Sequence, residues 1–330
     1  MKQVTTQSHS DLAQIAVLRY NTRENIGSEQ KEFAVNNRCR HLAYGVVGAA
    51  CSAFLTGCKL AILNPKGQVA IEEKNLLIDA ILLMLLVVVP VIIMTFWFAW
   101  RYRSSNKKAV YQPSFRHSNT IEFFCWGIPI IIIAILAKMT WTSSHRLDPY
   151  RQLEVGGKPM VIQAISLNWK WLFIYPEQNI ATVNTLTIPA NRQILFKITS
   201  DAPMNALEIP QLAGQVYAMG GMQTKLHVIA NHPGTYRGLS TSFSGDGFAG
   251  MHFKIHAVSE QQYQQWIKTV KGSKKVLSQS VYDELAKDSE NEPVHYYSQV
   301  KPTLYHDTIM KFMLPKSKAD FGKRPLETKR

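Results

Sequence analysis

The sequence has 330 residues, 46% of them apolar, and a formal net charge of +14. This length can hold a membrane anchor together with one core of domain size. Positive charge is concentrated in residues 101–117 and 311–330 while the rest of the body is close to neutral, so we do not expect nucleic acid as a partner.

Residues 1–57 are interpreted as an N-terminal extension and a lipoprotein signal peptide. A basic stretch, Arg38 to His41, precedes the small and apolar run Leu42 to Leu55, which is the layout of a secretory signal. The run ends in Leu-Thr-Gly-Cys and resembles a bacterial lipobox, so we expect lipidation of Cys58. The alternative is that Cys58 is a buried cysteine in a short helix. No cysteine pair remains for a disulfide in the soluble part.

After an outer segment over 58–75, residues 76–141 predict a hairpin of two transmembrane helices. Ala80–Trp100 contains 21 residues without a charge, and Ile121–Trp141 is apolar except near its ends. We expect neither helix to contain a histidine. Five Lys or Arg residues between the spans place that loop in the cytoplasm, so the N-terminus and the long C-terminal part lie outside.

Residues 142–258 predict an all-β sandwich, because short alternating runs are separated by Gly, Pro, Asn and Asp. The expected strands are Met160–Leu167, Trp169–Tyr175, Val183–Ile188, Gln193–Thr199, Ala206–Ile209, Thr224–Ile229, Gly234–Ser242 and Gly250–Val258. A C-terminal helical arm follows over 259–313, with helices at Glu260–Lys271 and Ser278–Lys287 and an aromatic stretch from Val294 that is suited to lie along a partner. Residues 314–330 predict a basic disordered tail.

The run from Gly238 to Met251 resembles the copper loop of subunit II of the haem-copper respiratory oxidases, C-x-x-x-C-x-x-x-H-x-x-M. On that pattern Ser240 and Ser244 replace the two thiolates, Phe248 replaces the histidine, and Met251 is retained. The upstream histidine of the family corresponds to Asn205. A serine hydroxyl binds copper weakly and phenylalanine not at all, so we expect no metal in this chain. The resemblance refines the sandwich to a cupredoxin-like Greek key.

Two further segments support the resemblance. Tyr217–Thr224 is similar to the Y-A-M-x-G-M-Q-T segment of ubiquinol oxidases of the cytochrome bo type, and Trp169–Pro176 is similar to the family's W-x-W-x-F-x-Y-P. In copper-bearing relatives an exposed aromatic in the second segment receives electrons. Here alternate aromatics that pack a sandwich core are the favoured interpretation, because no copper acceptor is expected.

Glu122 lies in a segment similar to the family's N-x-x-E-x-x-W-T-x-P, with Gly127 in place of the threonine. The resemblance implies that Glu122 lies near the cytoplasmic entrance of a proton channel in the large subunit. The alternative is an acid at the level of the lipid head groups that has no function.

The resemblance implies a non-catalytic subunit II of a proton-pumping ubiquinol oxidase in the bacterial inner membrane, with the C-terminal domain in the periplasm. Haem b, a high-spin haem and one copper are expected in the large subunit I, and no cofactor in this chain. Expected partners are subunit I, the other oxidase subunits, membrane lipids, and ubiquinol through the complex. The alternative is a membrane-anchored lipoprotein that acts as a scaffold or assembly factor through a cupredoxin-like domain.

Overall fold

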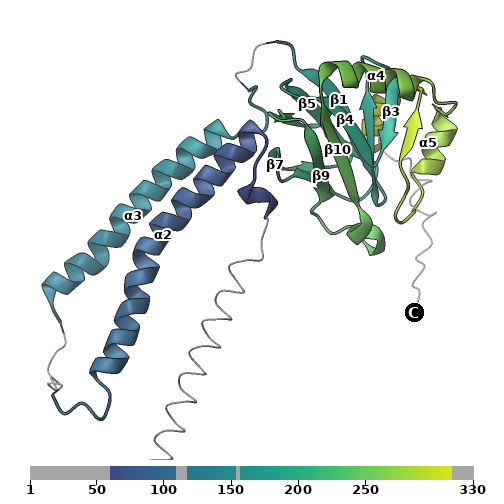
Figure 1. Ribbon diagram of the computed structural model, residues 1–330. Helices are drawn as coiled ribbons and strands as arrows, with labels where there is room; N and C mark the ends of the chain where they lie inside the picture. The colour runs from purple at the N-terminus through teal and green to yellow at the C-terminus, as the bar shows by residue number, and fades with distance from the viewer. Residues whose placement is uncertain (1–59, 109–116, 154–156, 314–330) are drawn as a thin grey trace, which may run out of the picture. The chain divides into compact units, whose positions relative to one another are not determined.

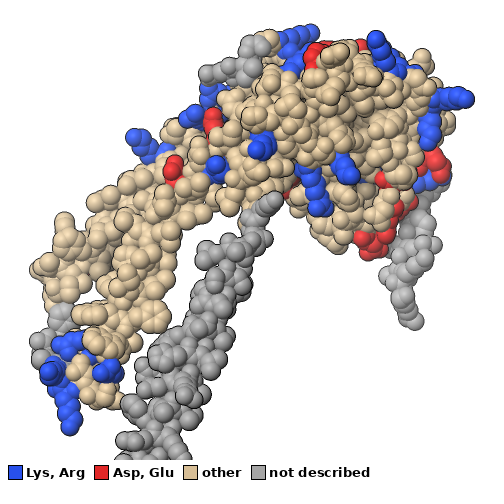
Figure 2. Space-filling view, viewed as in Figure 1, with Lys and Arg blue, Asp and Glu red and all other residues tan. Residues whose placement is uncertain are grey.

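The computed structural model describes residues 60–108, 117–153 and 157–313. A short helix, η1 (Ala61–Leu63), precedes two long helices, α2 (Gln68–Arg101) and α3 (Asn119–Arg146), which are long and apolar enough to cross a membrane (Figure 1). Figure 2 shows the surface of this hairpin as a largely uncharged band, with Lys and Arg gathered where α2 ends. Cys58 lies outside the described residues.

Both helices extend beyond the predicted spans at their outer ends. The added residues carry polar and charged side chains, including Glu72 in α2 and Arg146 in α3, whose side chains form an ion pair at 3.0 Å. One expectation is corrected by this extension, because α3 contains His145 in its last turn. The His145 ring nitrogen lies 2.8 Å from the carbonyl oxygen of Trp141.

The segment before α2 is bonded to the β domain. The backbone N–H groups of Lys66 and Gly67 donate to the Gln211 carbonyl at 2.7 and 3.0 Å, and the N–H of Asn231 donates to the Lys66 carbonyl at 2.9 Å. A Cβ atom on Gly67 would lie 2.3 Å from the Leu212 carbonyl oxygen. Only glycine permits this close approach of two backbones.

The β domain is a sandwich of two main sheets, as predicted. The six-stranded sheet has the order β12-β3-β2-β1-β5-β8 and the five-stranded sheet has the order β4-β10-β9-β6-β7. Pairs β1/β5 and β4/β10 are parallel, and the other pairs within these two sheets are antiparallel. The strands are β1 (Met160–Leu167), β2 (Lys170–Tyr175), β3 (Ile180–Val183), β4 (Thr185–Pro189), β5 (Ile194–Ser200), β6 (Asn205–Ile209), β7 (Ala213–Ala218), β8 (Thr224–Val228), β9 (Gly234–Ser240), β10 (His252–Val258) and β12 (His295–Tyr297).

The main core lies between the two sheets. Trp171, Phe173 and Tyr175 alternate along β2 and are fully buried in it, which confirms that these aromatics pack the sandwich. Helix α4 (Glu260–Lys271) begins and ends where predicted and buries Tyr263, Ile267 and Val270. Its first turn is closed by a capping box between Ser259 and Gln262.

The C-terminal arm covers the outer face of the six-stranded sheet. It contains β11 (Val276–Leu277), α5 (Gln279–Leu285), β13 (Gln299–Val300) and α6 (Leu304–Met313), and β11 pairs with β13. Tyr282, Tyr297 and Tyr305 pack against Leu172 and Ile174 in a second apolar core. The aromatic stretch therefore lies along the chain's own sheet, and β2 is buried on both faces, with all six residues buried.

Lys170 fixes the arm to the sheet. Its side chain is only 1% exposed, and the Nζ atom donates to the carbonyls of Leu285 at 2.9 Å and Lys287 at 2.8 Å and to the hydroxyl of Ser289. The Glu292 carboxylate lies 3.9 Å from the same Nζ atom. Burial lowers the pKa of Lys170, and the nearby carboxylates of Glu292 and Asp288 oppose that shift.

We expect Lys170→Met to lower the free energy of unfolding by about 2–3 kcal/mol, because two buried carbonyl groups lose their donor. Amides of residues 285–292 should then exchange faster with deuterium. Lys197→Met is the matched control, since Lys197 is a half-buried lysine in the same sheet whose side chain makes no polar contact with the described residues. Equal effects of the two changes on stability and exchange would contradict this role.

Candidate functional site

The five positions that were aligned with the copper pattern of the resembled family meet at one end of the sandwich. Asn205 begins β6, Ser240 ends β9, and the loop between β9 and β10 contains Ser244 and the short helix η2 (Asp246–Gly250), which includes Phe248. The Asn205 side-chain amide donates to the Met251 sulfur at 3.2 Å and to the Ser244 hydroxyl at 3.3 Å. Asn205, Ser240 and Met251 are buried, and Ser244 and Phe248 are half-buried.

Two tryptophans hold this loop. The indole N–H of Trp171 donates to the Ser240 hydroxyl at 2.8 Å, and the indole N–H of Trp169 donates to the Ser244 carbonyl at 2.9 Å. Gly247 lies flat against the Trp169 ring, where a Cβ atom would come within 2.5 Å of the ring carbons. Trp169 itself has a φ of 58°, a left-handed conformation that is costly for an aromatic residue.

The donor set of this cluster does not fit a two-copper centre. It offers one amide, two hydroxyls and one thioether, whereas a soft copper site needs thiolate and imidazole ligands. Phe248, where the copper pattern of the resembled family has a histidine, packs edge to face on Phe243 with ring centroids 5.6 Å apart. No group of three or more His, Cys, Asp or Glu side chains within residues 60–108, 117–153 and 157–313 is arranged to hold a metal ion.

The arm closes the same end of the sandwich. The Asn168 amide donates to the Asp288 carboxylate at 2.6 Å, next to the Lys170 contacts. A Cβ atom on Gly250 would lie 2.5 Å from the Asn291 side-chain oxygen. The arm therefore contacts the loop at Gly250 and the neighbouring β1–β2 turn at Asn168. Sequence reasoning missed this feature because Lys170 occupies a variable position of its motif and Asn291 belongs to no motif.

The quinol-type segment Tyr217–Thr224 forms the turn between β7 and β8. The Thr224 hydroxyl donates to the Tyr217 carbonyl at 2.7 Å and closes the turn. Gly221 has a φ of +73°, and a Cβ atom there would lie 3.1 Å from the Phe312 side chain of α6. The segment therefore serves as a packing surface for the last helix of the arm.

Glu122 lies in the first turn of α3, at the other end of the hairpin. Its Oε1 atom is 2.6 Å from Nδ1 of His117, and the side chains of Glu122 and His117 are 57% and 61% exposed. Phe123, Trp126 and Ile130 line an open groove of about 380 Å³ beside the carboxylate. The sequence reading did not single out His117, which precedes the helix and is five residues from Glu122.

Fold and site together define a class of protein: a subunit with two candidate membrane spans and a cupredoxin-type sandwich whose loop lacks copper-binding side chains. The family model described as the COX Aromatic Rich Motif matches residues 271–316. Cytochrome bo(3) ubiquinol oxidase subunit 2 of Pseudomonas aeruginosa is 52% identical over 263 residues, which cover 80% of each chain. Ubiquinol oxidase subunit 2 of Acetobacter aceti is 46% identical over 80% of this chain and 87% of its own.

Quinol oxidase subunit 2 of Bacillus cereus is 40% identical over 71% of this chain and 81% of its own. A likeness among solved structures is the periplasmic domain of subunit II of cytochrome oxidase of Bradyrhizobium japonicum, at 20% identity and a TM-score of 0.34, covering 35% of this chain and 95% of that chain. The chain belongs to the family of subunit 2 of the cytochrome bo(3) ubiquinol oxidases.

We expect Gly247→Ala to displace the loop from Trp169 and to lower the free energy of unfolding by about 1–3 kcal/mol, because the added methyl group overlaps the indole ring. The environment of Trp169 should change, which its fluorescence spectrum reports. Ala249→Ser, at an exposed position of the same short helix, is the control. It should change the free energy of unfolding by less than about 0.5 kcal/mol and leave the fluorescence spectrum unchanged. An unchanged spectrum in Gly247→Ala would contradict the contact.

Proposed function

We propose that this chain contributes no redox centre to its oxidase and that electrons enter the complex from ubiquinol through another subunit. The observation that carries the proposal is the cluster of Asn205, Ser240, Ser244 and Phe248, which stands at the former copper position without a thiolate or an imidazole. The proposal assigns haem b, a high-spin haem and one copper to the large subunit I. The sandwich of this chain then caps the outer face of that subunit, and its hairpin packs in the membrane.

Membrane orientation follows from charge and from the predicted lipid. The basic loop between α2 and α3 lies on the cytoplasmic side of the bacterial inner membrane, and the sandwich lies in the periplasm. Lipidation of Cys58 adds a third attachment on the periplasmic side. In this arrangement Glu122 and His117 lie at the cytoplasmic face.

We also infer that Glu122 supports proton entry into a channel of the large subunit. Its carboxylate is exposed, is bonded to an imidazole, and borders an open apolar groove suited to a partner helix. An acid and an imidazole in contact can pass a proton between them, which an isolated surface acid cannot do. These contacts support a role of Glu122 in proton entry over the alternative, in which it is an acid at the level of the lipid head groups that has no function.

Copurification in mild detergent separates this function from a scaffold or assembly factor. We expect a tagged chain to bring down a large haem-containing subunit with quinol oxidase activity and copper in a ratio of about one per complex. About two additional coppers bound to this chain would overturn the electron route, because such a ratio matches a two-copper centre. A chain that purifies without haem would favour the scaffold.

Glu122→Gln should slow steady-state oxygen consumption with ubiquinol as donor, because the amide cannot exchange the proton. The decrease should be smaller than the roughly hundredfold loss typical of a general acid at a reacting atom, since water still reaches the channel. Glu177→Gln, on an exposed turn of the sandwich, is the control and should leave turnover unchanged. Equal rates for the wild type and Glu122→Gln would remove the role in proton entry.

A further inference from the structure

A groove of about 560 Å³ lies between α2 and α3 toward their outer ends. Its floor includes Leu76, Ile135 and Met139, and two opposite charges, Asp79 and Lys138, line it. Both charged side chains belong to exposed residues. The groove therefore combines apolar and polar side chains, and Asp79 and Lys138 are two exposed groups of opposite charge in its lining.

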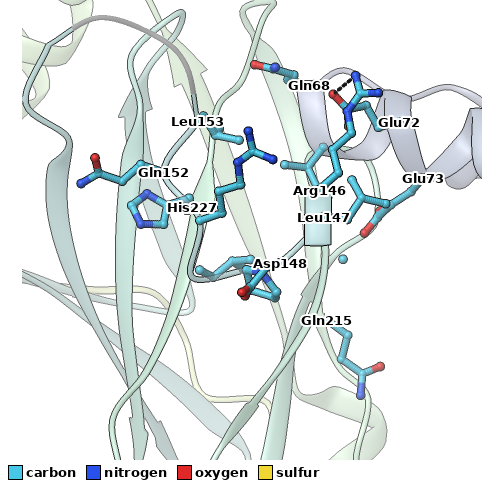
Figure 3. A pocket seen from close by; sticks show the side chains of 15 residues that line it. Gln68, Glu72, Glu73, Arg146, Leu147, Asp148, Gln152, Leu153, Gln215 and His227 are labelled. Atoms are coloured by element: carbon cyan, nitrogen blue, oxygen red, sulfur yellow. Dashed lines mark hydrogen bonds and ion pairs between the residues drawn. The ribbon is translucent and has the colours of Figure 1, made fainter. Parts of the chain in front are cut away.

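The Glu72–Arg146 ion pair lies at the outer mouth of this groove, and Figure 3 shows the two side chains meeting beside a second, polar pocket of about 310 Å³. Asp79 follows Glu72 by seven residues, and Lys138 precedes Arg146 by eight. At 3.6 residues per turn, both therefore fall on the same helix faces as the ion pair, about two turns or roughly 11 Å deeper. Asp79 and Lys138 thus lie at about the same depth, facing the same groove.

Within the described parts of the chain, neither the Asp79 nor the Lys138 side chain has an ion pair or a hydrogen-bonding partner, whereas Glu72 and Arg146, two turns further out, are paired. Ala80–Trp100 matches the thickness of the hydrocarbon layer, so Asp79 lies at its outer boundary, where phospholipid phosphates and head groups are found. Charged groups at this depth are costly unless they are paired, and a ligand that carries both charges can pair Asp79 and Lys138 together.

We propose that the groove binds the head group of an outer-leaflet glycerophospholipid that carries a primary ammonium group. Lys138 contacts the phosphate, Asp79 accepts hydrogen bonds from the ammonium group, and the acyl chains pass Ile135, which lies one turn deeper than Lys138 on α3. The two opposite charges favour a zwitterionic lipid over an anionic one, because a lipid without the ammonium group leaves Asp79 unpaired beside a phosphate. The site rests on the membrane orientation proposed above and is independent of the electron donor.

Native mass spectrometry of the purified oxidase, with palmitoyl-oleoyl phosphatidylethanolamine added, tests the proposal. We expect the wild type to retain one such lipid and to prefer it over the matching phosphatidylcholine and phosphatidylglycerol. Lys138→Gln should lower retention of all three lipids about fivefold, as expected for one lysine at a membrane surface. Asp79→Asn should lower only the preference for phosphatidylethanolamine over phosphatidylcholine, because the quaternary ammonium offers no N–H to the carboxylate.

Lys107→Gln, beyond the opposite end of α2, is the matched control and should retain the wild-type profile. Equal lipid retention in Lys138→Gln and the control would overturn the proposal. Retention by the isolated chain but not by the assembled oxidase would also overturn it, because another subunit then fills the groove. Copper content and quinol oxidation are measured separately, so failure of the lipid site is distinguishable from failure of the proposed electron route.

Discussion

Three consecutive residues, Trp169, Lys170 and Trp171, join the loop, the arm and the core. Trp171 points into the sandwich and bonds Ser240, Lys170 points outward and bonds the arm, and Trp169 supports the loop at Ser244. Each contact uses a different side of the chain, because side chains alternate along a strand and Trp169 lies in a left-handed turn before it. Removing one of the three therefore loosens a different part of the domain.

This arrangement explains how the loop keeps its shape without thiolate or imidazole side chains at these positions. A metal centre draws several distant residues to one point, and here hydrogen bonds from two indoles and one amide connect the same positions. Each bond contributes only about 1 kcal/mol, but the loop is also packed against the Trp169 ring and the arm. The result is a loop whose geometry depends on aromatic packing, as the close contact at Gly247 illustrates.

The sequence carries clear signals for elements with a regular apolar pattern. Helix α4 was predictable because a capping box and a 3.6-residue period coincide, and the two spans were predictable from uninterrupted apolar runs. The polar outer ends of α2 and α3 were not predictable, since the charged residues there are typical of a loop. The contacts of Lys170 were missed for a similar reason: a lysine next to the core residue Trp171 looks solvent-facing until the arm, more than a hundred residues later, covers it. Contacts between segments so far apart leave no local pattern.

The bonded segment before α2 has a mechanical consequence. Backbone hydrogen bonds join Lys66 and Gly67 to Gln211, and Asn231 to Lys66, immediately before the helix begins at Gln68. A pull on the chain upstream of this point is therefore borne first by the turn between β6 and β7, and not by the helix. The backbone contact at Gly67 transmits tension from the preceding segment to the β domain, so that this tension does not shift the position of α2.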